Sequence, residues 1–190
     1  MEVNRNAYLK HFPIDKYVDF VVNRQHSAWD WTQAEQHGKW IESAYLSAVQ
    51  GDDKELLIKA ESVLNRIIDS QEANGYVGAT AKSFRSPERP VRGMDAYELY
   101  FVFHAFITVY EETGDKKALT AAEKLADYFL QYFGPGKLEF WPSDLRAPEN
   151  KQKHLDGHSD FAGHSVHYSW EGTLLCDPIT RPVSYTHLRA

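Results

Sequence analysis

A helical segment occurs twice in this 190-residue chain, and the repeat limits the chain to a small set of folds. The copies open with Gly-Asp pairs at Gly51 and Gly114, and each reaches an Ala-Glu pair, at 60–61 and at 122–123. The offset is 63 residues at the glycines and 62 at the Ala-Glu pairs. Glycine favours a turn and aspartate caps helix N-termini, so each copy is expected to begin as a turn followed by a capped helix.

Apolar residues spaced three and four apart follow each Gly-Asp pair, which is the pattern of an amphipathic helix. Each of these helices is expected to end near glycine, at 74–75 and at 134–136. Similar spacing predicts a preceding helix for each copy, over 39–49 and 94–113, and a further helix over 13–24. Another helix is expected to start near residue 170. The repeating unit is therefore helix, short turn, helix and long loop.

The fold class predicted from this unit is all-α. No strand pattern competes with the helices, and a period near 60 residues exceeds the 34–47 residues or so of common helical solenoids. An α/α toroid built of antiparallel helix hairpins fits this longer period. The two long connections, 74–93 and 134–168, then lie on one face. Functional residues are expected there, because long loops without secondary structure are usually functional.

Composition excludes several classes of partner. The formal net charge is −6 and no basic block is present, so neither nucleic acid nor an anionic membrane is an expected partner. No apolar run reaches the roughly 18 residues of a membrane span. Residues 1–6 are polar and lack the apolar core of a signal peptide, which favours a cytoplasmic location. Cys176 is the single cysteine, so it forms no internal disulfide or Cys-rich zinc site, and a packing role is expected for it. No feature of the sequence indicates an oligomeric state.

Aromatic residues make up 14% of the chain, and 9 histidines accompany them. Rings of this kind commonly line sugar-binding clefts, although they also fill helical cores. Trp40 is either a stacking platform or a packing anchor, and His104 is either a core histidine or a residue that lines the interior of the toroid. The candidate substrate-binding residues are Trp40, Glu98, His104, Trp141, His158, His164, Trp170 and Glu171.

Histidines and carboxylates gather in the second long loop, but their spacing is not that of a known zinc site. A polar cleft lining is therefore expected, and no residue is assigned to a metal. Glycoside hydrolysis commonly uses paired carboxylates. The acids expected on the long-loop face are Glu35, Asp95, Glu98, Asp156, Asp160 and Glu171. None of them forms a pair that the sequence singles out, so no catalytic residue is assigned.

Several motifs resemble one family. The segment Gly-Lys-Trp-Ile-Glu-Ser-Ala at 38–44 resembles the Gly-Lys-Trp-hydrophobic-Glu-Ala-Ala helix of the β-L-arabinofuranosidases, glycoside hydrolase family 127. Residues 71–78 resemble that family's Gln-x-x-Asp-Gly-Tyr-Leu-Gly segment. Residues 97–100 and 110–115 resemble its next helix and its Tyr-x-x-Thr-Gly-Asp turn, and 177–181 resemble the start of the helix that follows.

The resemblance implies an (α/α)6 barrel of twelve helices, of which this chain would hold roughly the first five. Residues 1–181 are then a partial barrel domain. Residues 182–190 are expected to be a non-native tail, because Pro182 breaks the last helix and the tail resembles translated adapter sequence.

The implied substrates are plant-type sugars that contain arabinose. Well-known members of the family use a cysteine nucleophile, a glutamate acid/base and a zinc ion, all held by later parts of the barrel. The resemblance thus implies no cofactor in this chain, zinc in the longer protein, and no glycosidase activity for the chain alone.

Two alternatives remain at this stage. One is another sugar-active α/α toroid, related to unsaturated glucuronyl hydrolases or to N-acylglucosamine 2-epimerases. An epimerase relative would need paired histidines on facing helices, and only His104 qualifies. The other is a non-catalytic helical scaffold that binds peptide or protein, which predicts an apolar groove.

Overall fold

The computed structural model describes residues 5–25, 35–91, 95–133 and 135–138. Their five α-helices are α2 (Ile14–Val22), α3 (Glu35–Gly51), α4 (Lys54–Asp69), α5 (Asp95–Thr113) and α6 (Lys116–Tyr132). A π-helical turn, η1 (Arg5–Leu9), precedes them, and a 3-10 turn, η2 (Lys82–Phe84), lies between α4 and α5. β-pairing in these ranges is restricted to two isolated bridges. The predicted all-α class is confirmed, while the helix expected near residue 170 lies outside the described ranges.

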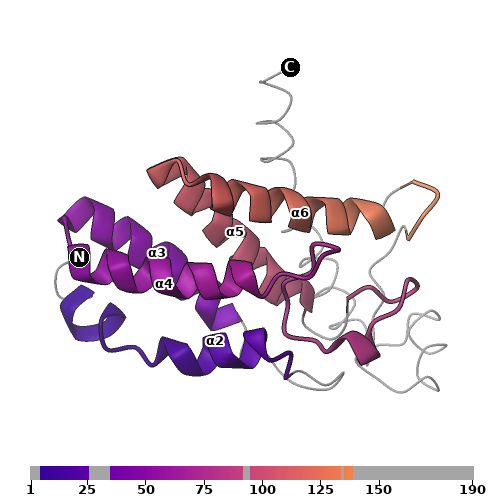
Figure 1. Ribbon diagram of the computed structural model, residues 1–190, viewed down its shortest axis with the longest axis horizontal. Coiled ribbons are helices and arrows are strands. Elements are labelled where there is room, and N and C mark those ends of the chain that lie inside the picture. Colours follow the sequence, from indigo (N-terminus) through magenta and orange to yellow (C-terminus); the bar gives the residue numbers. More distant parts are fainter. Residues whose placement is uncertain (1–4, 26–34, 92–94, 134, 139–190) are drawn as a thin grey trace, which may run out of the picture.

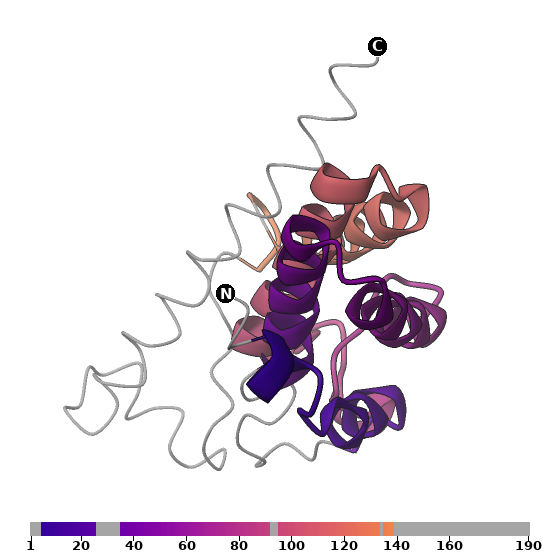
Figure 2. The ribbon, with the colours of Figure 1, turned by 90° about the vertical axis from the view of Figure 1, so that its left-hand side faces the viewer.

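The helices form two layers, α3 and α5 in one and α2, α4 and α6 in the other (Figure 2). The contact between α3 and α5 is the most extensive between any two helices in the described part of the chain. The short turns that end α3 and α5 lie at one end of the molecule, at the left in Figure 1. The connection from α4 to α5 lies at the opposite end, as the sequence predicted. None of the described helices is long and apolar enough to cross a membrane.

The short turns show how the two copies of the repeat correspond. Asp53 caps α4 by accepting a hydrogen bond from the backbone N–H of Leu56, at 3.1 Å. Asp115 caps α6 in the same way and accepts from the N–H of Lys117, at 2.8 Å. The residue before each cap has left-handed backbone, Asp52 with φ +47° and Gly114 with φ +74°. The copies therefore align at an offset of 62 throughout. The expected equivalence of the two Gly-Asp pairs is wrong, because Gly51 still belongs to α3.

Helix α4 ends at Asp69, before the glycine that was expected to stop it. The hydroxyl of Ser70 donates to the carbonyl of Ile67 at 2.7 Å and covers the last turn. Gly75 serves a different purpose, with φ +97° and its backbone against α6. A Cβ at Gly75 would lie 2.0 Å from the carbonyl oxygen of Lys124, so only glycine fits this approach.

Gly38 sets the distance between α3 and α5. A Cβ at this position would lie 2.5 Å from the carbonyl carbon of Phe101 and 2.6 Å from the amide nitrogen of Val102. Because real Cβ atoms do not approach backbone this closely, any larger residue would push the two helices apart. The absence of a side chain at Gly38 thus brings the following turns of α3 and α5 into side-chain contact.

Candidate functional site

A polar cluster joins the two helices of the α3–α5 layer. The hydroxyl of Thr108 donates to Oε1 of Glu42 at 2.9 Å, and Nδ1 of His104 lies 3.4 Å from the same oxygen. Glu42 belongs to α3, while His104 and Thr108 lie one turn apart on α5. The side chains of Glu42 and His104 are 29% and 21% exposed, so the cluster stands at the boundary between core and surface. We call these three residues the inner cluster.

Aromatic and charged side chains extend the inner cluster toward the helix N-termini. The ring of Tyr100 lies 5.1 Å from the ring of His104, centroid to centroid, and limits how the imidazole can tilt. The ammonium of Lys39 lies 4.3 Å from the centroid of the Phe101 ring and 3.0 Å from a carboxylate oxygen of Glu35. This partly exposed strip of α3 and α5 therefore carries hydrogen-bonding groups of both kinds beside aromatic rings.

Trp40 belongs to the packed core. Its side chain is 3% exposed, and its indole N–H donates to the carbonyl of Leu9 at 3.1 Å. The ammonium of Lys59 stands 5.4 Å from the centroid of the indole ring. A stacking platform needs an exposed ring face, so the structure favours the packing anchor among the two alternatives for Trp40.

Asp95, the first residue of α5, anchors the loop that precedes it. Its Oδ1 accepts hydrogen bonds from the hydroxyls of Tyr76, at 2.9 Å, and Thr80, at 2.8 Å. The Tyr76 oxygen also accepts from the backbone N–H of Thr80, at 3.0 Å. All three residues are fully buried, and this burial, followed by the charge of Asp95, raises the pKa of Tyr76. Asp95 therefore secures the loop in addition to placing negative charge at a helix N-terminus.

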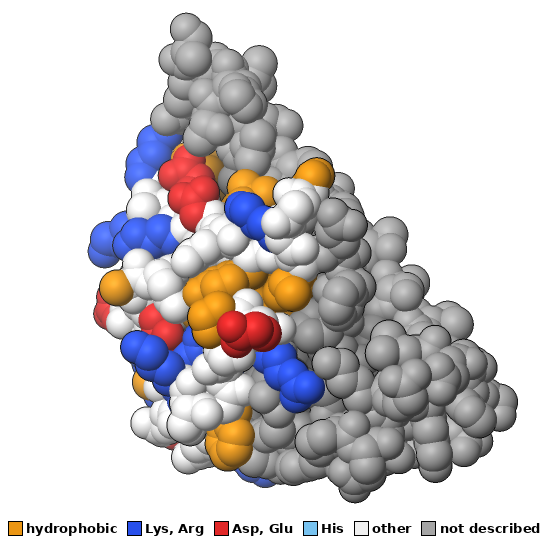
Figure 3. All heavy atoms as spheres, turned by 90° about the vertical axis from the view of Figure 1, so that its right-hand side faces the viewer, with side chains coloured by type: hydrophobic (Ala, Val, Ile, Leu, Met, Phe, Trp, Pro, Cys, Tyr) orange, Lys and Arg blue, Asp and Glu red, His pale blue; other side chains and the backbone are white. Residues whose placement is uncertain are grey.

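The side chain of Arg85 packs over the ring of Tyr76. The guanidinium of Arg85 lies 3.5 Å from the ring centroid, donates to the carbonyl of Thr80 at 3.2 Å and pairs with Glu72. Tyr128 of α6 packs its ring 5.4 Å from that of Tyr76. On the face of the molecule that Figure 3 shows, charged side chains of both signs border a small apolar area. The described part of the first long connection, 74–91, is thus a packed structure whose side chains contact one another.

Glu98, one turn after Asp95, is 1% exposed. The structure places it beneath the surface at the long-loop end, and its proposed contact with sugar stays a prediction. The other candidates, Trp141, His158, His164, Trp170 and Glu171, lie outside the described residues. Of the three candidates among the described residues, His104 alone lies on a partly exposed face.

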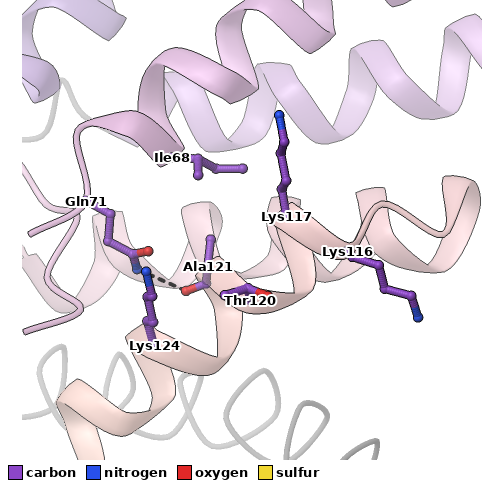
Figure 4. Close-up of a pocket in the computed structure, with 7 residues that line it drawn as sticks. All are labelled: Ile68, Gln71, Lys116, Lys117, Thr120, Ala121 and Lys124. Atoms are coloured by element: carbon purple, nitrogen blue, oxygen red, sulfur yellow. Dashed lines mark hydrogen bonds between the residues drawn. The ribbon is translucent and has the colours of Figure 1, made fainter. Parts of the chain in front are cut away.

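A groove between α4 and α6 lies on the other layer of the molecule. Its volume is about 320 Å³, and the residues that line it are Ile68, Gln71, Lys116, Lys117, Thr120, Ala121 and Lys124. The amide of Gln71 donates to the carbonyl of Gly75 at 2.9 Å. It also donates to the carbonyl of Ala121 at 3.0 Å, the bond marked in Figure 4. Figure 4 also shows the Lys116 side chain directed away from the rest. The amide of Gln71 thus ties the end of α4 to α6, and the groove is separate from the inner cluster.

The arrangement of these helices is similar to that of known proteins. Two solved structures share the fold, and both are described as family 127 β-arabinofuranosidases. The match to one has a TM-score of 0.53 at 20% sequence identity. It covers 85% of this chain and 29% of the chain of that structure. The match to the other, from Geobacillus stearothermophilus T6, has a TM-score of 0.51 at 18% sequence identity. It covers 82% of this chain and 26% of the chain of that structure. The described helices are thus part of an α/α barrel.

The family follows from the sequence. The profile of the family described as "Beta-L-arabinofuranosidase, GH127 catalytic domain" matches residues 3–141, so the chain belongs to this family. A "Non-reducing end beta-L-arabinofuranosidase" from Bifidobacterium longum subsp. longum is 29% identical over 104 residues, which are 51% of this chain and 16% of that protein. The chain spans less than a third of the length of each of these relatives.

The zinc that the family resemblance implies finds no set of ligands in the described part of the chain. No group of three or more His, Cys, Asp or Glu residues there is placed to hold a metal ion. Cys176, the single thiol, lies outside the described residues.

Proposed function

We propose that this chain is part of a glycoside hydrolase that acts on β-L-arabinofuranosides, and that its α3–α5 layer lines the sugar cleft. Family membership and the function named for the Bifidobacterium longum relative support this proposal. The observation that carries it is the inner cluster. Glu42, His104 and Thr108 place polar atoms on a partly exposed strip of two helices whose buried residues are mostly apolar.

The inner cluster suits binding rather than bond cleavage. A furanose ring presents hydroxyls that both donate and accept, and imidazole and carboxylate groups match them. His104 would contact a hydroxyl of the sugar, while Tyr100 beside it offers part of a ring surface. Cleavage itself needs an acid and a nucleophile or base, and these groups would come from parts of the protein beyond α6.

The test uses the protein encoded by the source gene when it is read past the codon of Arg181. We expect this longer protein to hydrolyse an aryl β-L-arabinofuranoside and not the α-anomer, whereas the 190-residue chain alone is inactive. Replacement of His104 by alanine should lower kcat/KM by about 10-fold, the effect of losing one ligand hydrogen bond to a polar group.

The matched control is His11→Ala, because His11 is exposed between η1 and α2. This variant should keep full activity. Hydrolysis of an unsaturated glucuronide instead of the arabinofuranoside would overturn the proposed substrate, and equal effects of the two histidine variants would remove His104 from the cleft.

A further inference from the structure

The Glu42–His104 contact determines which nitrogen of the imidazole carries the proton. A neutral histidine has one N–H donor and one acceptor nitrogen, and a carboxylate only accepts. Nδ1 of His104 faces Oε1 of Glu42 at 3.4 Å, and the Thr108 hydroxyl already donates to that oxygen. If Nδ1 carried a lone pair, it would face the negative carboxylate without a proton between them. The proton therefore belongs on Nδ1, and Nε2 is the acceptor.

We propose that Glu42 is a positioning residue, which holds His104 in the Nδ1–H form and thereby makes Nε2 a hydrogen-bond acceptor for a substrate hydroxyl. This inference rests on the proposed function. The contact crosses between α3 and α5, the two helices that Gly38 brings close together. Tyr100 and Thr108, one turn before and one turn after His104, hold the imidazole and the carboxylate in place.

This assignment has a consequence for specificity. An acceptor nitrogen recognises a group that donates, so His104 would select a free hydroxyl and reject an ether oxygen at the same position. The glycosidic oxygen and the ring oxygen of a furanoside only accept. His104 would therefore contact one of the sugar hydroxyls, and a sugar methylated at that hydroxyl would lose the contact.

The first test measures the tautomer directly. Long-range ¹⁵N–¹H correlation spectra of the 190-residue chain, at a pH where the imidazole is neutral, distinguish a protonated Nδ1 from a protonated Nε2. The signals of His104 among the 9 histidines are identified by their absence from a His104→Gln spectrum. We expect Nδ1–H in the wild type, a change to Nε2–H in Glu42→Met, and retention of Nδ1–H in Glu42→Gln, whose amide oxygen still accepts.

The matched control is Glu61→Met, the same replacement at an exposed position of α4, which should leave the His104 signals unchanged. Should Glu42→Met fail to fold, Thr108→Val provides a second variant, because it removes the hydroxyl that fixes Oε1 and should shift the tautomer in part. Nε2–H in the wild type, or Nδ1–H retained in Glu42→Met, would overturn the proposal.

The second test measures catalysis in the longer protein. Glu42→Met should lower kcat/KM on an aryl β-L-arabinofuranoside by about 10-fold, and Glu42→Gln by much less. This penalty should vanish on the analogue methylated at the hydroxyl that His104 contacts, because the contact is already lost there. An equal penalty on every methylated analogue would indicate a purely structural role and overturn the proposal.

The two tests distinguish a failure of the proposed function from a failure of the role proposed for Glu42. If the tautomer is Nδ1–H and depends on Glu42, but no arabinofuranoside is hydrolysed, the proposed function fails while the placement of His104 by Glu42 stands. If arabinofuranosides are hydrolysed but the tautomer is Nε2–H, the proposed function stands and the role of Glu42 is refuted.

Discussion

His37 should make the folded chain sensitive to acid. It lies in the first turn of α3 with 1% of its surface exposed. Neither ring nitrogen has a hydrogen-bond partner among the residues that the structure describes. Burial removes the water that would stabilise the charged form, and this lowers the pKa of His37 from 6.5 to about 3. The folded chain therefore holds a neutral imidazole over a pH range in which the unfolded chain is protonated.

The sign and the size of the effect follow from this difference. Above about pH 6.5 His37 is neutral in both states, and it adds no pH dependence. As the pH falls below the unfolded value, the unfolded chain gains a proton that the folded chain does not bind, so the free energy of unfolding decreases until the folded pKa is reached. At about pH 4.5 the loss is about 3 kcal/mol. That is a large share of the 5–15 kcal/mol or so that stabilises a typical domain.

The assay is urea unfolding followed by tryptophan fluorescence, at about pH 7 and about pH 4.5, for the wild type and for His37→Leu. Comparing the two proteins cancels every other acid-sensitive group. We expect His37→Leu to lose about 3 kcal/mol less than the wild type on acidification. It should also be more stable at neutral pH by about 1–3 kcal/mol, because a buried polar group without partners has been removed. The exposed His11, changed to leucine, is the matched control and should behave as the wild type. Equal acid sensitivity of the wild type and His37→Leu would refute the reasoning.

Three further substitutions test the packing. Gly38→Ala should lower the free energy of unfolding by about 2 kcal/mol, since its Cβ would meet the backbone of Phe101; an unchanged melting temperature would contradict the close approach. Asp52→Gly should raise stability by about 0.5 kcal/mol in urea unfolding, because glycine adopts φ +47° without strain; a loss would show that the turn needs the aspartate. Tyr76→Phe should cost about 1–3 kcal/mol and speed amide exchange in the loop before α5, because Asp95 loses a buried donor; protection as in the wild type would argue against the anchor.

Local sequence pattern was sufficient for the described helices. Apolar spacing of three and four placed α4 and α6, and each Gly-Asp pair predicted an aspartate cap. Asp115 forms the expected cap of α6, whereas α4 is capped by Asp53, one residue after the Gly-Asp pair. The pattern was less reliable at the turn itself. Two Gly-Asp pairs that look equivalent differ by one residue, because Asp52 takes the left-handed position that Gly114 takes in the other copy.

The residues of the candidate site were likewise predicted only in part from the sequence. The sequence singled out His104 as a polar residue within an apolar helix, and it left Trp40 between two roles. The structure decided for the packing anchor because the indole N–H reaches the carbonyl of Leu9. Glu42 was not singled out, although it lies in the Gly-Lys-Trp motif, because nothing near it in the sequence shows what it contacts.

The sequence by itself determined which of the described segments are helical and that aspartates precede α4 and α6. These properties depend on neighbours within four residues, so local pattern is enough to read them. Only the tertiary structure decided that Glu42 meets His104 and that Tyr76 meets Asp95, because these partners are 62 and 19 residues apart. Such contacts depend on how closely helices and loops pack, and at α3 and α5 the missing side chain of Gly38 sets that distance.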